Sequence, residues 1–411
     1  MQNAGESPAL FSSTLDRRRF LGKSIGLAAG VQLAVPALAA ESQDTKPKFR
    51  TAIIGETGRG DYGHEHDLIF NGRENISVVA VADPDEAGRA KAAAKTHAWR
   101  QYADYRKMLE EEKPQLVSIA TRWTDYHHAM ATAALRVGAH VYLEKPITQT
   151  LAEADEMLEV ANQKGLKIVV AHQMRLAPNI LFAKKCLEDG LIGELLEIRA
   201  HGKQDQRAGG EDLIVLGIHL FDLMRFFAGD PLWCSARVLQ KGREITPTDA
   251  HPASEHIGPV VGDEVVAQFA FPKGVNATFT SRAKNRESAG PWGLELVGTK
   301  GALKVVAGIM PGIYARKSGS WAANGQTSEW RPLEKDPTLA LPESEKGVTR
   351  ANQRVVDDWL GAIDQKREPA CSGYAAMKAL EMAMAVFAAG LSRGRVELPL
   401  KERGHPLRAK A

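Results

Sequence analysis

Cysteine is scarce in this chain of 411 residues, which holds only Cys186, Cys234 and Cys371. Three widely spaced cysteines suit neither a disulfide framework nor a metal-binding pair, so we expect the cysteines to be buried small apolar side chains.

Neither sign of charge predominates in the chain, since 53 Lys and Arg against 50 Asp and Glu leave a formal net charge of +3. No basic run is interleaved with aromatic residues, which argues against nucleic acid and favours a small-molecule substrate.

Long hydrophobic runs are also missing, and no segment after residue 40 is apolar enough to be a membrane anchor. The weakly apolar stretch 25–35 follows Arg17-Arg18-Arg19 and precedes Ala37-Leu38-Ala39. This order predicts a twin-arginine signal peptide at 1–39, a polar linker at 40–48 and export of the folded protein to the periplasm. A chance basic stretch on a disordered tail is the alternative.

Hydrophobic residues make up 44% of the chain and charged residues 25%, an ordinary globular composition at a length that favours two domains. Strand-like and helix-like segments alternate as far as residue 171. Strands are expected at 49–55, 76–83, 116–120, 139–143 and 167–171, and helices at 86–97, 125–138 and 151–164. The alternation predicts an α/β Rossmann domain at 49–171 with a doubly wound parallel sheet.

The pattern changes after residue 171. Helices are expected at 179–189, 213–227, 352–365 and 375–392, and strands at 194–202, 261–271, 274–281, 294–297 and 302–306. Successive strands joined by turns pair antiparallel. We therefore expect an α+β domain at 172–400 with an open, mostly antiparallel sheet for substrate and homo-oligomer contacts, a polar excursion at 311–346 and a tail at 401–411.

The first chemical signal is a glycine-rich turn at 55–63, between a strand and an expected helix. Glycine lets the backbone approach a pyrophosphate that binds amides at a helix N-terminus. The turn therefore predicts dinucleotide binding by Gly55, Thr57, Gly58, Arg59 and Gly60. Thr57 stands where G-x-G-x-x-G has its second glycine, so a tight structural turn is the alternative.

Asp83, which ends the second strand, supports the dinucleotide interpretation. A carboxylate there can accept hydrogen bonds from the ribose hydroxyls and repel a 2′-phosphate. It favours NAD over NADP, although Arg59 and Arg89 could compensate. A turn-forming Asp before Pro84 is the alternative.

The second signal is Glu144-Lys145-Pro146, directly after the strand-like run that ends at Leu143. Lys145 at the carboxyl end of a parallel strand would project into the crevice where doubly wound sheets bind ligands. Together with the glycine-rich turn, Asp83 and the preceding Ala133 to Val141 stretch, this block resembles the Gfo/Idh/MocA family of glucose-fructose oxidoreductases and inositol dehydrogenases. The likeness runs from about residue 49 to 400.

The resemblance implies a role for each matching residue. Lys145 would hydrogen-bond the reacting hydroxyl and stabilise charge on its oxygen, with Glu144 beside the cofactor and a cis bond before Pro146. His219 would be the general base, because imidazole titrates near neutrality. Family members commonly have an Asp four residues earlier, where this chain has Val215. The alternatives without a catalytic role are a solvated lysine at a strand end for Lys145 and a histidine packed within a helix for His219.

Weaker candidates surround these residues. Thr121, Arg122 and His127 would meet the cofactor, while Trp123, Gln173, Arg175 and Asp222 would bind substrate. His64-x-His66 and the pair His251 and His256 have metal-like spacing but no thiol or carboxylate nearby in sequence. We interpret them as loop residues and expect no metal.

The combined prediction is an exported NAD(P)-dependent oxidoreductase that transfers a hydride between a sugar or polyol and tightly bound NAD. No free dinucleotide pool exists outside the cytoplasm, so the cofactor would be regenerated in place. One alternative is a glycosidase or lyase that oxidises a sugar transiently with no net redox change. Another is a binding protein without turnover, which Val215 makes conceivable.

Overall fold

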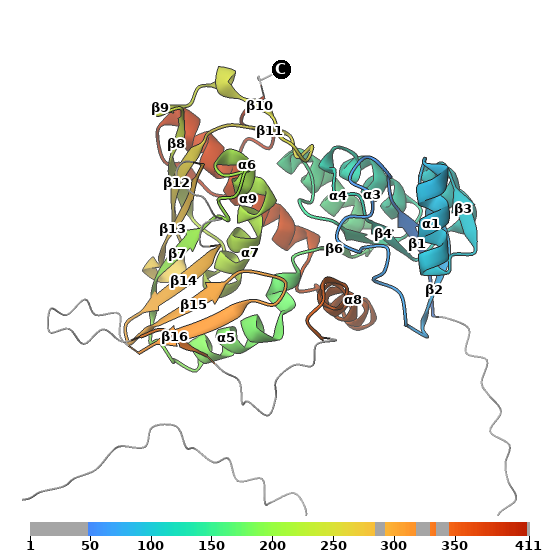
Figure 1. Cartoon of the computed structure of the whole chain (residues 1–411), viewed down its shortest axis with the longest axis horizontal. Helices are drawn as coiled ribbons and strands as arrows, with labels where there is room; N and C mark the ends of the chain where they lie inside the picture. Colours follow the sequence, from blue (N-terminus) through green and yellow to red (C-terminus); the bar gives the residue numbers. More distant parts are fainter. Residues whose placement is uncertain (1–47, 284–291, 318–328, 334–344, 409–411) are drawn as a thin grey trace, which may run out of the picture. The chain divides into compact units, whose positions relative to one another are not determined.

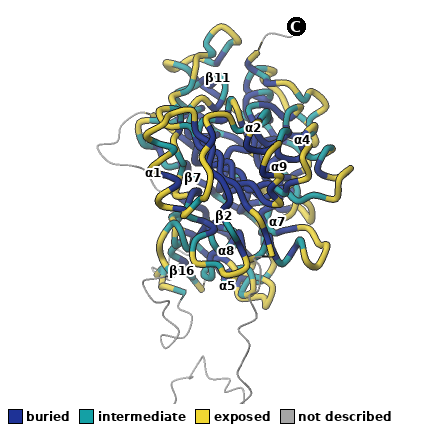
Figure 2. The backbone as a smooth tube through the Cα atoms, turned by 90° about the vertical axis from the view of Figure 1, so that its right-hand side faces the viewer, coloured by how far each residue is buried: buried dark blue, intermediate teal, exposed yellow. Residues whose placement is uncertain are grey.

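The computed structural model describes residues 48–283, 292–317, 329–333 and 345–408. The predicted signal peptide and the linker up to residue 47 lie outside these residues. Within them the buried backbone is concentrated in the strands and the long helix near the C-terminus, and the exposed backbone in the connecting loops (Figure 2).

The N-terminal part is a six-stranded sheet of order β3-β2-β1-β4-β5-β6, in which all neighbours pair parallel. The strands are β1 Phe49–Ile54, β2 Ile76–Ala82, β3 Arg100–Tyr102, β4 Leu116–Ile119, β5 His140–Leu143 and β6 Ile168–Val170. The helices are α1 Glu86–Thr96, α2 Tyr105–Glu112, α3 His127–Arg136 and α4 Leu151–Gln163. The predicted doubly wound sheet is confirmed, and β3 and α2 are additional to the sequence prediction.

Local sequence explains where these elements begin. Strands β2 and β4 are almost wholly buried and apolar, as parallel strands covered on both faces require. Asp85 caps α1 by accepting from the Gly88 amide. Thr150 and Glu153 form a reciprocal capping box at the start of α4.

The helix predicted after the glycine-rich turn does not form. Residues 55–75 run from β1 to β2 through a series of turns. The physical reason is the backbone conformation, because Gly58, Gly60, Asp61, Gly63 and Glu65 all have positive φ, which an α-helix cannot contain. The glycine-rich turn therefore does not lead directly into a helix, although the first turn of α1 packs against Thr57 at Gly88.

The C-terminal part has a ten-stranded mixed sheet of order β17-β16-β15-β14-β7-β13-β12-β8-β18, with β9 on β8. Its strands are β7 Leu195–His201, β8 Trp233–Gln240, β9 Arg243–Glu244, β12 Glu264–Ala270, β13 Asn276–Arg282, β14 Gly293–Gly298, β15 Ala302–Val306, β16 Gly312–Arg316, β17 Arg331–Pro332 and β18 Val396–Glu397. A separate pair joins β10 His251–Pro252 and β11 Pro259–Val260. The sheet is mostly antiparallel as predicted, except that β7 and β13 pair parallel.

Helices α6 Gly210–Val215, α7 Gly217–Ala228 and α9 Gly373–Ser392 cover one face of this sheet (Figure 1). Helix α5 Pro178–Glu188 lies beside β16. By length and composition α9 could cross a membrane, but 78% of its most apolar window is buried inside the protein. It is a core helix, which explains its apolar sequence.

Cys234 and Cys371 are buried as expected, whereas Cys186 is only partly buried.

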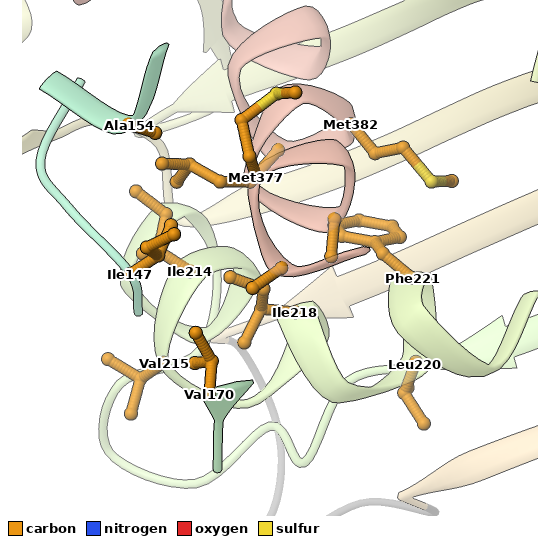
Figure 3. Close-up of a cluster of buried hydrophobic side chains, with 14 of the residues drawn as sticks. Ile147, Ala154, Val170, Ile214, Val215, Ile218, Leu220, Phe221, Met377 and Met382 are labelled. Atoms are coloured by element: carbon orange, nitrogen blue, oxygen red, sulfur yellow. The ribbon is translucent and has the colours of Figure 1, made fainter. Parts of the chain in front are cut away.

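The N-terminal and C-terminal parts contribute side chains to one common apolar cluster. Ile147 and Val170 from the N-terminal part lie in one buried apolar cluster with Val215, Ile218 and Met377 (Figure 3). Helix α8 Val348–Gln365, although late in the sequence, packs against the N-terminal sheet through the fully buried Trp359. The segment 401–408 is also tied down, because Arg403 forms ion pairs with Asp155 and Glu381.

Candidate active site

Lys145 lies at the carboxyl end of β5 and is only 7% exposed. Its Nζ donates to the Val215 carbonyl oxygen at 3.3 Å and lies 3.9 Å from Glu144 Oε1. The Lys145-Pro146 peptide is cis, as expected. Helix α6 ends at Val215 and α7 begins at Gly217, so the break in the predicted single helix frees this carbonyl for the lysine.

Glu144 is held by two imidazoles. Its Oε1 is 3.1 Å from His64 Nδ1, a hydrogen bond, and its Oε2 is 3.0 Å from His66 Nε2. Burial alone would raise the pKa of Glu144, but the imidazoles of His66 and His64 and the charge on Lys145 lower it well below its usual range. His64 and His66 lie in turns as predicted. The expectation that no carboxylate lies near them is wrong, since the tertiary structure brings Glu144 from 80 positions away to His64.

His219 on α7 is buried beside this group. Its Nδ1 has no hydrogen-bond partner, and its ring stands edge-on to His172 with centroids 5.4 Å apart. Burial lowers the pKa of His219 well below the ordinary value, and His172 and Lys145 lower it further. Trp292 lies 6.3 Å from the same ring, with its indole N–H unpartnered. His219 is therefore neutral near pH 7.

His172 lies two residues beyond the end of β6 at Val170. Burial lowers its pKa to about 4, and neither ring nitrogen has a partner. The neighbouring Gln173 is 8% exposed and its Oε1 is also unpartnered. These orphaned polar atoms indicate a site that takes a polar ligand.

Arg175 and Asp222 are bound to each other. Arg175 Nε donates to Asp222 Oδ2 at 2.9 Å, and both side chains are almost fully buried. Each charge is thus neutralised within the protein. Asp222 does not pair with His219 despite the helical spacing, and substrate contact by this ion pair stays a prediction.

The glycine-rich turn is closed by Asp83. This carboxylate is fully buried and accepts hydrogen bonds from the Thr57 amide and hydroxyl, the latter at 2.7 Å, and from the Asp85 amide. Arg89 donates to the Asp83 carbonyl at 2.6 Å. Asp83 therefore fixes the turn, and its contact with a ribose stays a prediction.

Residues after β4 pack on this turn. The Thr121 hydroxyl donates to the Arg59 carbonyl at 2.6 Å, and the Arg122 amide donates to the Gly60 carbonyl at 3.3 Å. The His127 nitrogens face two carbonyls, Thr121 at 2.8 Å and Pro146 at 2.9 Å. Burial lowers the pKa of His127 against the opposing effect of these carbonyls. The His127 side chain therefore lies between the segments that follow β4 and β5, and the N-cap of α3 is Tyr126 instead.

Trp123 is already stacked within the protein. The His256 ring lies parallel to it with centroids 3.8 Å apart, and the Arg59 guanidinium is 5.2 Å from its centroid. Arg59 also ion-pairs with Asp125 at 2.8 Å. A sugar on the face that His256 covers would have to displace that ring, so Trp292 is the better placed aromatic residue near His219.

A cavity of about 180 Å³ opens at the carboxyl ends of β1 and β2. Its lining combines apolar and aromatic groups with polar ends, as a flat purine ring requires. The residues are Ile54, Gly55, Glu56, Ala82, Asp83, Pro84, Ala103, Tyr105, Arg106, Tyr126 and Met130. The cavity and the orphaned atoms beside Lys145 fit the two ends of a dinucleotide that crosses the edge of the sheet.

Residues 49–172 match the Gfo/Idh/MocA oxidoreductase family, NAD-binding Rossmann fold, and residues 184–398 match its C-terminal alpha/beta domain. The chain belongs to the Gfo/Idh/MocA family. The predicted family, fold class, enzyme class and NAD cofactor are thereby confirmed.

Relatives in this Gfo/Idh/MocA family are distant. Levoglucosan dehydrogenase from Pseudarthrobacter phenanthrenivorans is 27% identical over 61% of this chain and 72% of its own length. D-apiose dehydrogenase from Paraburkholderia graminis is 25% identical over 88% and 93%. 2,7-anhydro-N-acetylneuraminate hydratase from Mediterraneibacter gnavus is 27% identical over 62% and 68%. The structure of a levoglucosan dehydrogenase with NADH has a TM-score of 0.70, at 20% identity over 85% of this chain and 99% of that one, and shows the shared fold.

Sequence reasoning missed His64, His66, His172 and Trp292 as parts of this site. His172 had a usable signal, because it follows a parallel strand at the edge where such sheets bind ligands. The other three come from loops, or from the residue just before β14, and nothing in their local sequence points to Glu144 or His219.

Proposed function

We propose that this Gfo/Idh/MocA protein oxidises a hydroxyl group of a sugar or polyol and passes the hydride to tightly bound NAD. The observation that carries the proposal is a neutral buried imidazole, His219, whose pKa is lowered by the charge of a buried ammonium group, Lys145, at the carboxyl end of β5. The names of the levoglucosan and D-apiose relatives support a sugar substrate.

Each group then has a defined task. His219 accepts the hydroxyl proton, and Lys145 donates a hydrogen bond to the same oxygen and stabilises its developing negative charge. Gly55 to Gly60, Asp83 and Tyr126 would hold the dinucleotide, which supplies the hydride acceptor when bound. Burial of Lys145 and His219 excludes water and strengthens the electrostatic interactions between them and the substrate.

Protein purified without added cofactor should release NAD on denaturation, because an enzyme that works outside the cytoplasm must retain its cofactor. We would identify the released dinucleotide by mass spectrometry and then offer the native protein levoglucosan, D-apiose, L-sorbose, D-glucose and myo-inositol while following the absorbance of reduced nicotinamide. An empty preparation that gains no thermal stability with NAD or NADP and oxidises none of these sugars would refute the proposal.

The hydratase relative favours a second candidate, transient oxidation of a sugar followed by elimination or hydration and return of the hydride. In that case the nicotinamide returns to its starting state after each turnover. Mass analysis of the product distinguishes the two. Loss of two hydrogens indicates a dehydrogenase, whereas gain or loss of water, or cleavage of a glycoside, indicates the second reaction.

We further propose export through the twin-arginine route, with a mature protein that begins near Ala40. The support is the order of Arg17-Arg18, the apolar stretch 25–35 and Ala37-Leu38-Ala39. Replacing Arg17 and Arg18 with Lys should retain the protein in the cytoplasm of a bacterial host. A double variant that still reaches the periplasmic fraction in normal amount would contradict this.

A further inference from the structure

A bound dinucleotide has to cross the segment that follows β4. In the order of the sheet β4 lies between β1 and β5. The cavity for a purine ring opens at the carboxyl ends of β1 and β2, and Lys145 stands at the carboxyl end of β5. A ligand that extends from that cavity to Lys145 therefore passes the residues after β4, Thr121 to Trp123. Contacts made above these residues bear on how the cofactor enters and leaves.

The hairpin of β10 and β11, with its loop at 253–258, reaches this point from the C-terminal part. Glu255 in the loop forms an ion pair with Arg207 at 2.7 Å. The Ser254 amide donates to the Glu211 side chain on α6 at 3.1 Å. The loop is thus anchored to the C-terminal part on one side.

His256, at the tip of this loop, makes the contacts with the N-terminal part. Its ring stacks on Trp123 with centroids 3.8 Å apart and an angle of 13° between the planes. Its Nδ1 lies 3.6 Å from Asp125 Oδ2, and its carbonyl accepts from the Gln149 side chain at 2.8 Å. Trp123 follows β4, whereas Gln149 follows β5. His256 therefore links the two segments that a dinucleotide touches on its way to Lys145.

The tip is held by specific contacts and has room to move. The backbone of His256 is left-handed, with φ 52°, a conformation that a residue other than glycine adopts at a cost and keeps where its surroundings hold it. A cavity of about 420 Å³ borders the hairpin, with Gln149, His256 and Arg408 in its lining. Loss of a few contacts would let the tip swing into this space.

We propose that the loop 253–258 is a clasp over the cofactor groove, closed by the stack of His256 on Trp123, which has to open whenever NAD enters or leaves. The inference rests on the proposal that NAD stays tightly bound, and it supplies a structural cause for that retention. His256 is thus a positioning residue that acts through Trp123 and does not touch the reacting atoms.

A clasp differs from an ordinary binding contact in its kinetics. When NAD passes only through the open form, the observed rate constants of association and dissociation are both scaled by the fraction of protein that is open. The stack is made by protein groups alone, so weakening it raises both rate constants by the same factor and leaves Kd unchanged. Loss of a side chain that merely touches bound NAD would raise the dissociation rate constant alone.

The test compares His256→Ala with two controls. His256→Ala should raise both rate constants about 2- to 10-fold, the factor that corresponds to the strength of one aromatic pair. His256→Phe keeps a ring on Trp123 and should behave as the wild type. His251→Ala should also leave both rate constants unchanged, because His251 is exposed in the same hairpin and its ring faces the Pro252 carbonyl.

NAD release is measured by chasing bound radiolabelled NAD with unlabelled NAD. NAD uptake is followed by tryptophan fluorescence in protein freed of nucleotide by dialysis against charcoal. A rise of both rate constants by one factor in His256→Ala alone supports the clasp. A rise of the dissociation rate constant only, no change in either, or an equal rise in His251→Ala or His256→Phe overturns it.

The outcomes also separate the clasp from the proposals on which it builds. Wild-type NAD that exchanges within the mixing time refutes tight retention and the clasp together. Slow release that His256→Ala leaves unchanged refutes the clasp alone. No sugar enters these measurements, so a failure of the proposed oxidation is detected separately. Unfolding temperatures of the variants show that the fold is retained.

Discussion

At the scale of single residues, the site depends on groups whose ordinary behaviour is changed by burial. His219 loses the solvation that an imidazolium needs, so burial lowers its pKa. Glu144 is equally buried but stays charged, because His66, His64 and Lys145 surround it. A neutral imidazole and a charged carboxylate, both without their titratable proton, are thus maintained within one cluster.

The acid limb of kcat/KM should lie well below the pKa of about 6.5 of free imidazole. His219 works as a base only when neutral. Burial, His172 and Lys145 all lower its pKa, against the opposing charge of Glu144, so the neutral form persists as the pH falls through the usual range. A pH profile between acid and neutral buffers measures this.

His219→Ala is the control for that profile. It should lower the rate by roughly 10²- to 10⁴-fold and remove the acid limb, while NAD remains bound. An acid limb at or above the ordinary histidine pKa, or a variant of undiminished rate, would take His219 out of the mechanism.

Val215 shows how one residue changes the expected chemistry. Its side chain lies in the apolar cluster with Ile147 and Val170, whereas its carbonyl oxygen accepts from Lys145 (Figure 3). The chain thus presents a main-chain dipole to the lysine where the family commonly has an Asp. Glu144 is the carboxylate that lies near the ammonium group instead.

At the scale of elements, the segment between β1 and β2 departs most from expectation. A strand followed by glycines normally leads into a helix, but several left-handed residues keep this segment in turns. The turns bring His64 and His66 to the end of β5. A regular helix would place successive side chains on different faces and could not present both imidazoles to the same carboxylate.

Gly63→Ala should destabilise the protein more than Gly72→Ala in the same segment. Both glycines have positive φ, so each substitution costs roughly 1–2 kcal/mol of backbone strain. A Cβ on Gly63 would also lie 2.5 Å from the Ala120 carbonyl oxygen, whereas one on Gly72 meets nothing within 4 Å. The added clash should cost about 1–3 kcal/mol more.

Denaturant unfolding of the two variants measures this difference. Gly63→Ala should also weaken the contact between His64 and Glu144, which nitrogen NMR of labelled histidine reports. Equal losses of stability in the two variants would show that the close approach to β4 contributes nothing.

At the scale of the whole molecule, late parts of the chain complete the early domain. Trp359 on α8 lies in the core under β1, β4 and β5, with its ring 6.2 Å from that of Tyr142. Asn352 on the same helix holds His64. The site therefore depends on packing between residues far apart in the sequence, since the contact between Asn352 and His64 spans 288 positions.

The sequence by itself determined the elements whose signals are local. Hydrophobic periodicity predicted most strands and helices of both parts, and the strand-end position of Lys145 predicted a place in the site. The block Glu144-Lys145-Pro146 also pointed to the family that the comparisons confirm. These signals are carried by neighbouring residues, so they can be recognised before any tertiary contact is known.

Only the tertiary structure decided which residues meet. It paired His64 and His66 with Glu144, tied Asp83 to Thr57, covered Trp123 with His256 and set β7 parallel to β13. None of these contacts has a local signal, because the partner of a side chain or strand depends on how distant segments pack. The physical reason is that burial, which sets both strand neighbours and the charge states of the site, is a property of the assembled core and not of a stretch of sequence.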